Sequence, residues 1–257
     1  MQLWQIASGV FFLYVALIVL WRGGSRPADR RAMAGAAIGL LLVLASALVL
    51  APLPTSLIWP PLLLLVAYWS SGLLFVAPRP RQEAALRWLD DVVNVREAAR
   101  RTPRALVEIL EAAYAGVYLL IPLALLVRIW FVPPADVDRF WSIVLITDFV
   151  CFGVLPWVQT RPPRALEAGD PWRSSFRAFN LRLLGATSIQ VNTFPSGHAA
   201  EALAAALLVL GAPAGIVALM LAAALAVSAG AVLGRYHYLA DALAGWAVAA
   251  GVFWALA

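Results

Sequence analysis

Two histidines occur in this sequence, and each stands beside residues whose types suit proton transfer at a bound anion. The first, His198, lies in the stretch FPSGH. Pro195 and Ser196 favour the start of a helix, with the serine as its cap, and Gly197 lets a ligand approach the backbone. The apolar run that follows predicts a helix, whose first unpaired N–H groups attract anions. We therefore predict that His198 exchanges a proton with an anion bound there.

The second histidine, His237, is followed four positions later by Asp241 in the stretch HYLAD. If the chain is helical from Tyr238 onward, this spacing places the two side chains on one face. The carboxylate then holds one ring nitrogen as N–H, and the other nitrogen is left unprotonated and nucleophilic. A lone histidine at a helix start is often only a cap or a packed residue, but two such motifs together favour chemistry.

Three arginines lie close to these motifs. Arg161 and Arg164 flank a Pro-Pro pair in the segment before FPSGH, and Arg235 stands two residues before His237. Guanidinium groups suit phosphate oxygens, so the set predicts phosphate chemistry without a cofactor. A zinc site built on both histidines and Asp241 is an alternative, but an anion-binding PSGH stretch argues against a metal.

The elements that must position these residues are apolar helices. A hydrophobic fraction of 63% with 13% charged residues is too apolar for a soluble globular domain. We predict an all-α, polytopic membrane protein with about eight transmembrane helices. The predicted windows are 3–21, 32–51, 57–77, 106–132, 140–158, 196–211, 213–233 and 238–257. The first is too long for the apolar region of a signal peptide and is predicted to span the membrane.

The sequence contains no lysine, so its net charge of +5 comes from arginine. The arginines gather in segments 22–31, 78–104 and 161–182, which indicates orientation and anionic headgroups rather than nucleic acid. With eight helices, these segments are cytoplasmic and both termini lie outside. Segment 78–104 is predicted to be an amphipathic helix on the membrane surface, with an apolar stripe at Leu86, Leu89 and Val93.

Three further residues are notable inside apolar runs. Asp148 is a functional candidate, or a partner of Arg128 or of a polar backbone group. Glu201 contacts substrate, tunes His198 or forms an internal hydrogen bond. The single cysteine, Cys151, excludes an internal disulfide and is predicted to be a core residue. The last three windows are rich in Ala and Gly, which predicts close helix packing.

On these motifs the sequence resembles the type 2 phosphatidic acid phosphatase and vanadium haloperoxidase superfamily. The family's PSGH motif is complete at 195–198, the end of its SRxxxxxHxxxD motif is present at 237–241, and its first motif survives only as Arg161-Pro162. Val154 stands where the family has a lysine, and Ala231 where it has an arginine. The similarity spans roughly 106–257. It implies a six-helix catalytic domain over 57–257, with its motifs within 160–241, after N-terminal transmembrane helices over 1–56.

The resemblance also implies roles. His237 attacks phosphorus to form a phosphohistidine, Asp241 orients His237, and His198 protonates the leaving oxygen. The residues that hold phosphate are Ser196, Gly197, Arg161 and, as replacements for missing cations, Arg164 and Arg235. No metal or other cofactor is implied.

The predicted function is therefore that of an integral-membrane lipid phosphatase that hydrolyses a phosphomonoester or pyrophosphate in a bacterial inner membrane. Its partners are a phosphorylated lipid and the bilayer. Two features, Pro162-Pro163-Arg164 and His237-Tyr238, look more like the inositol phosphorylceramide synthase branch of the family. A lipid head-group phosphotransferase is therefore the first alternative. A transporter of anionic lipids is the second, although the sequence lacks the paired discontinuous helices typical of transporters.

Overall fold

The computed structural model describes residues 1–48, 54–134 and 136–256, and this part of the chain is all helical, without a strand. The all-α prediction is confirmed. The helices are α1 (Leu3–Trp21), α2 (Pro27–Leu48), α3 (Pro54–Gly72), α4 (Pro80–Val92), α5 (Val95–Arg101), α6 (Arg104–Ala115), α7 (Val117–Phe131), α8 (Val137–Gly153), α9 (Ser175–Thr187), α10 (Gly197–Leu208), α11 (Ala214–Leu233) and α12 (Leu239–Ala255), with a short 3₁₀ turn at Pro163–Ala165.

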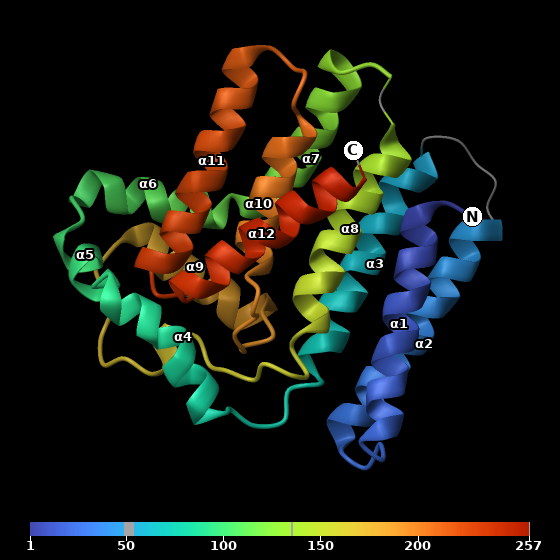
Figure 1. Cartoon of the computed structure of the whole chain (residues 1–257), viewed down its shortest axis with the longest axis horizontal. Helices are drawn as coiled ribbons and strands as arrows, with labels where there is room; N and C mark the ends of the chain where they lie inside the picture. The colour runs from blue at the N-terminus through green and yellow to red at the C-terminus, as the bar shows by residue number, and fades with distance from the viewer. Residues whose placement is uncertain (49–53, 135, 257) are drawn as a thin grey trace.

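The N-terminal helices form one side of the molecule. Helices α1 and α2 pack as a hairpin against α3 and α8 (Figure 1). The hairpin is tight at Gly39 of α2, where an added Cβ atom would lie 2.4 Å from the ring of Phe12. Phe12 itself is fully buried. A glycine is therefore needed for α1 and α2 to approach each other at this level.

Helix α10 occupies the centre of the other half and packs against α7, α8, α11 and α12. Its core-facing side chains are mostly alanines, which lets neighbouring backbones come close. At Gly245 of α12, an added Cβ would lie 2.5 Å from the carbonyl oxygen of Ser196. The predicted close packing of the last helices is confirmed, and it brings α12 against the start of α10.

Fewer helices satisfy the length and composition of a membrane span than the eight predicted. Among the described residues α1, α2 and α11 do so, and α6 with α7 adds a fourth if the pair is one span. The part of α3 over Leu57–Gly72 and helices α10 and α12 are apolar but shorter. The predicted single helix over 106–132 is wrong, because the chain bends by 67° between α6 and α7 at Gly116, a poor helix former. These long apolar helices are compatible with a membrane protein, and the count of eight is not confirmed.

Two further predicted boundaries can be compared with the described residues. The end of the window 32–51 lies partly outside the described residues, and α2 is described to Leu48. A division between 56 and 57 falls inside α3.

The two ends of the described chain lie together. The side chain of Gln2 donates to the Asp138 carboxylate at 2.7 Å, and Arg139 donates to the carbonyl oxygen of Leu256 at 2.6 Å, so both ends meet the start of α8. At the other end of α8, Arg22 donates to the carbonyl oxygen of Pro156 at 3.0 Å. The arginine-rich segment after α1 is therefore at the opposite end of the molecule from the termini.

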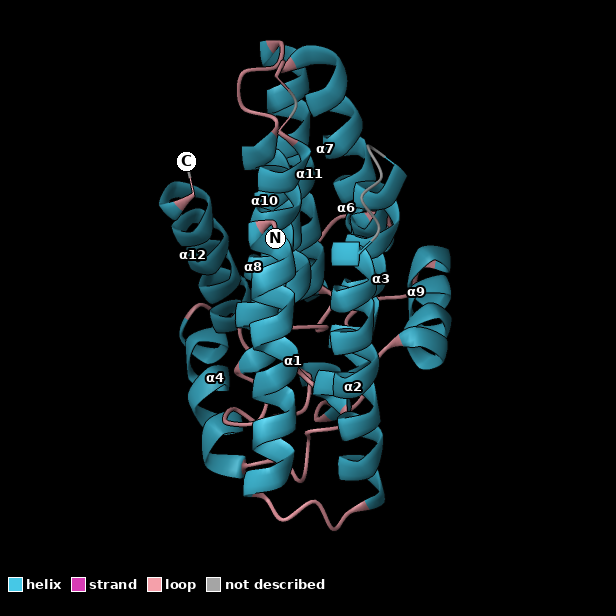
Figure 2. Ribbon diagram, turned by 90° about the vertical axis from the view of Figure 1, so that its right-hand side faces the viewer, coloured by secondary structure: helices cyan, strands magenta, loops and turns pink. Residues whose placement is uncertain are grey.

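Segment 78–104 forms two helices rather than one. The chain turns at Asn94, whose φ of 53° is in the left-handed region, and α4 then gives way to α5. Helix α4 packs against α12, and Figure 2 shows the two helices on the same side of the molecule. Of the predicted apolar stripe, Leu86 is buried and Val93 is half exposed, while two carboxylates, Glu83 and Asp90, are buried. The inner face of α4 is thus fixed by charge as well as by apolar contact.

Candidate active site

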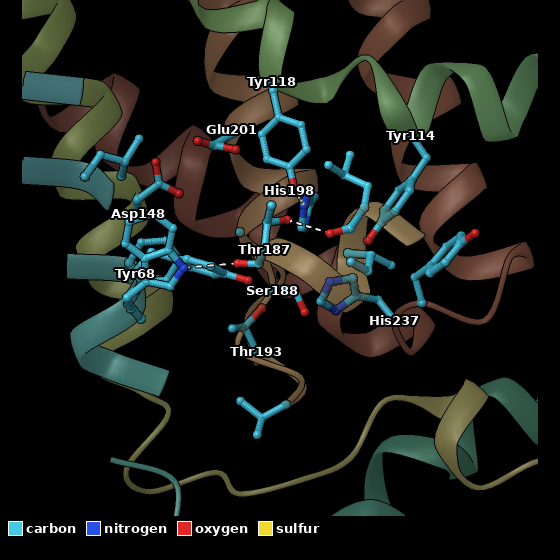
Figure 3. A pocket seen from close by; sticks show the side chains of 18 of the residues that line it. Tyr68, Tyr114, Tyr118, Asp148, Thr187, Ser188, Thr193, His198, Glu201 and His237 are labelled. Atoms are coloured by element: carbon cyan, nitrogen blue, oxygen red, sulfur yellow. Dashed lines mark hydrogen bonds between the residues drawn. The ribbon is translucent and has the colours of Figure 1, made fainter. Parts of the chain in front are cut away.

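Both histidines line one cavity of ≈ 420 Å³ in the C-terminal half of the molecule. Arg164 and Gly197 line it too. Figure 3 shows the rings of His198 and His237 directed into the same space, and their ring centroids are 5.8 Å apart. The structure therefore brings together the centres of the two histidine motifs, which are 39 residues apart in sequence.

His237 lies in the loop between α11 and α12. Its backbone N–H donates to the carbonyl oxygen of Ala231 at 3.0 Å. The carboxylate of Asp241 accepts from the backbone N–H of Tyr238 at 2.9 Å, and its Oδ2 is 3.4 Å from Nδ1 of His237, as the i, i+4 spacing predicts. Burial, and after it the charge of Arg164, lowers the pKa of His237 to about 3. The imidazole is therefore neutral at pH 7, and an Nδ1–H directed at Asp241 leaves Nε2 free to act as a nucleophile.

His198 stands in the first turn of α10, whose N-cap is Ser196. The Oγ of Ser196 accepts a hydrogen bond from the backbone N–H of Ala199 at 3.3 Å. The backbone N–H of Ser196 donates to the carbonyl oxygen of Asp241 at 2.9 Å. This second bond ties the PSGH stretch to α12. Ser196 and Asp241 are fully buried and do not line the cavity, so they lie behind the residues that do.

The three predicted phosphate-binding arginines have different surroundings. Arg161 forms a bidentate pair with Glu83, at 2.9 Å from each oxygen, and Arg235 pairs with Asp90 at 2.7 Å and with Glu167. Neither of them lines the cavity. Arg164 lines the cavity, and within the described ranges no carboxylate forms an ion pair with it. Of the three, only Arg164 is placed to meet an anion beside the histidines.

Arg235 instead holds the histidine loop in place. Its φ of 61° marks a tight turn, and Asp90, which pairs with it, also accepts from the backbone N–H of Leu239 at 2.8 Å. Helix α4 thus fixes both sides of His237. The Glu83 pair does the same for the segment before the 3₁₀ turn, and it lowers the pKa of Glu83.

The opposite side of this loop rests on a second buried network. Tyr236 stacks on Tyr114 at 4.2 Å between ring centroids and donates its hydroxyl to Glu111 at 2.7 Å. Glu111 also accepts from Arg177 at 3.2 Å and from Asn180 at 2.7 Å. The loop that carries His237 is therefore clamped between α4 on one side and α6 with α9 on the other.

Sequence reasoning missed the tyrosines around His198. The Tyr118 hydroxyl is 3.3 Å from Nε2 of His198, and the Tyr114 ring centroid is 5.2 Å from that of His198. Tyr114 and Tyr118 are spaced i, i+4 in an apolar run, a signal that was available in the sequence. The bend between α6 and α7 directs both toward the cavity, as Figure 3 shows.

Of the alternatives for Asp148, the pairing with Arg128 does not occur. Arg128 donates to the carbonyl oxygen of Leu208 at 3.1 Å, whereas Asp148 lines the cavity, as Glu201 does. Cys151 is fully buried, as predicted for a core residue. In the described part of the chain no group of three or more His, Cys, Asp and Glu side chains is arranged to hold a metal ion.

Comparison with known proteins gives one match. A family model described as the PAP2 superfamily matches residues 87–255, which include both histidine motifs and the arginines before them. No curated protein and no solved structure matches the chain.

Proposed function

This chain belongs to the PAP2 superfamily, whose members are generally phosphatases, and we propose that it is an integral-membrane lipid phosphatase of the cell membrane. The observation that carries the proposal is the cavity, which has His198, His237 and Arg164 at one part of its wall and apolar side chains over much of the rest. Such a cavity suits a molecule with a phosphate at one end and hydrocarbon at the other.

The first step of the proposed reaction uses His237 as the nucleophile. Its free nitrogen bonds to phosphorus as the bond from phosphorus to the lipid oxygen breaks, and Arg164 stabilises the charge on the phosphoryl oxygens. A bound phosphate dianion favours the protonated form of His198, which gives its proton to the departing oxygen. The products of this step are a lipid alcohol and a phosphohistidine.

The second step restores the enzyme. Water enters on the side that the alcohol has left, His198 takes a proton from it, and its oxygen bonds to phosphorus as the bond to His237 breaks. Phosphate then leaves. Asp241 is a positioning residue, because it holds Nδ1 of His237 and so keeps the other nitrogen directed at phosphorus.

The lipid nature of the substrate is supported by the outer part of the cavity. Leu65 and Trp69 of α3 line it and are half exposed, and Leu183 of α9 lines it from the other side. The Trp69 ring N–H donates to the carbonyl oxygen of Thr187 at 3.0 Å, so α3 and α9 meet at this edge. Figure 2 shows α9 beside α3 on one flank of the bundle. A hydrocarbon chain is the ligand that such a lateral apolar wall suits.

Phosphate release by purified protein in detergent tests the proposal. We expect turnover of lipid phosphates or pyrophosphates and none of the same lipids by His237→Ala. If the protein releases phosphate from none of these lipid phosphates and pyrophosphates, it is not a lipid phosphatase. Movement of an anionic lipid across vesicle membranes without phosphate release would favour the transporter instead.

Transfer to a second alcohol is the other candidate, and one observation favours it. His237 is buried and His198 is partly buried, and both line the cavity, so any acceptor must reach them through the same apolar-walled space as the lipid. A head-group phosphotransferase would form a histidine intermediate in which phosphorus still carries the head group, and a lipid hydroxyl would then take the phosphorylated head group from His237. Adding a lipid alcohol to the assay distinguishes the two, because a transferase converts it to a phosphorylated lipid in preference to releasing phosphate.

A further inference from the structure

Two carboxyl groups line the cavity beside His198 and take no part in the reaction proposed above. Asp148 comes from the middle of α8, and Glu201 lies three residues after His198 in α10. Figure 3 shows both side chains at the cavity, on the side of His198 away from His237. An added Cβ on Gly197 would lie 3.7 Å from Oδ1 of Asp148, so this carboxyl group adjoins the helix start that precedes His198.

Among the described residues, no cationic side chain forms an ion pair with either carboxyl group. Asp148 is fully buried, and neither of its oxygens receives a hydrogen bond from a donor in the described residues. Figure 3 shows it beside Glu201 at the cavity, and two adjacent carboxyl groups that are shielded from bulk water do not both ionise. One of the two therefore keeps a proton, and the buried oxygens of Asp148 still lack a donor among the described residues. An oxygen of this kind is costly unless a ligand supplies the hydrogen bond.

The position of the pair relative to the reacting groups says which part of a ligand it meets. In an in-line displacement, the leaving oxygen is opposite the nucleophile. With His237 as nucleophile, the leaving oxygen lies next to His198, and the alcohol attached to it extends toward Asp148 and Glu201. The pair is thus beside the alcohol, whereas Arg164 is the cation for the phosphoryl group.

We propose that Asp148 and Glu201 bind a free hydroxyl group on the alcohol portion of the substrate, next to the phosphoester. This inference rests on the proposed function and adds a substrate class to it. A carboxyl pair with one proton both donates and accepts, and a hydroxyl group does the same, whereas an ammonium group only donates. The enzyme then selects lipid phosphates with a free hydroxyl beside the ester over those in which that position is blocked.

Two matched substrates test the selection. One is 1-oleoylglycerol 3-phosphate, which has a free hydroxyl next to the phosphoester, and the other is its 2-O-methyl ether, in which a methyl group replaces the hydroxyl proton. We expect kcat/KM to be about 10- to 100-fold higher for the hydroxyl compound, as befits a hydrogen bond to a charged group. Glu201→Gln and Asp148→Asn should bring this ratio toward one. Leu65→Ala, an apolar change in the same cavity, should lower both values alike and keep the ratio.

The ratio of kcat/KM for the two substrates tests this inference separately from the proposed function. If wild-type protein turns over both compounds equally, the hydroxyl site is wrong and the phosphatase stands, and this result needs no variant to fold. A 2-amino analogue that is preferred to the hydroxyl compound, with the preference lost in Glu201→Gln, would also overturn the hydroxyl assignment and replace it with an amine. If wild-type protein turns over no lipid phosphate at all, both the inference and the proposed function are wrong.

Discussion

His198 and His237 face the same cavity but should differ in what their loss does. Without His237 no phosphoenzyme forms, so His237→Ala should abolish turnover of every substrate. His198 matters in proportion to how poor the leaving group is. His198→Ala should lower turnover of a lipid phosphate by ~10²–10⁴ and spare much more of the reaction with a nitrophenyl phosphate, whose leaving group departs without a proton.

The measurement is a comparison of rates for both variants on both substrates, with folding checked by gel filtration in detergent. The turnover rate of Asp241→Asn should fall between those of the two histidine variants. This variant keeps His237 as the nucleophile but no longer fixes the tautomer of its ring. Equal losses for His198→Ala on the two substrates would remove its role as general acid.

The protonation of His237 gives a prediction about pH. Burial lowers its pKa to about 3, so the imidazole should stay neutral as pH falls from 8 to 5, where an exposed histidine becomes charged. In His198→Ala protein, His237 is the sole histidine. NMR of protein with ¹⁵N-labelled histidine therefore reports on it alone. A midpoint near 6.5 would contradict the buried, neutral nucleophile.

Removal of metal ions should leave activity unchanged if histidine and arginine side chains do the chemistry. Phosphate release is measured before and after dialysis against EDTA. Loss of activity with recovery on addition of one divalent ion would restore the alternative of a metal site.

The residues of the site differ in how well the sequence predicts them. The i, i+4 spacing of His237 and Asp241 is a local property, and their contact was predictable. The choice among arginines was not, because it depends on distant carboxylates: Glu83 pairs with Arg161, and Asp90 with Arg235. Asp90 and Arg235 are 145 residues apart, a distance that no periodicity spans.

Among the elements, α4 has the clearest mechanical role. Asp90→Asn should weaken the ion pair with Arg235 and increase the mobility of the loop that carries His237. Breaking a buried ion pair costs about 3–5 kcal/mol, so both the melting temperature in detergent and kcat should fall. Glu97→Gln is the matched control on α5, since its exposed pair with Arg101 contributes little. Equal melting of the two variants would show that α4 does not hold the loop.

Element boundaries followed hydropathy where a helix is uniformly apolar. The window 3–21 has the same bounds as α1, and α11 was predicted within one residue. The bend at Gly116 was missed, because the run over 106–132 is apolar on both sides of it. The buried carboxylates of α4 were also missed, since an amphipathic pattern assigns charge to solvent and takes no account of an arginine that arrives from another helix.

On the scale of the whole molecule, charge predicts orientation. The arginine-rich segment after α1 is at the opposite end of α8 from both ends of the described chain, as the predicted orientation requires of this segment. By the positive-inside rule the arginine side is cytoplasmic. A reporter fused to the C-terminus should therefore be active outside the cytoplasm, and a cytoplasmic signal would contradict this topology.

The central claim is that His237 carries the phosphoryl group, and trapping that intermediate tests it most directly. Purified protein is mixed with a lipid phosphate labelled with ³²P, quenched in base within the first turnover and digested to peptides. We predict a label that is stable to base, labile to acid, located on the peptide containing His237, and absent in His237→Ala. Turnover without such a label, or a label on another side chain, would contradict the account.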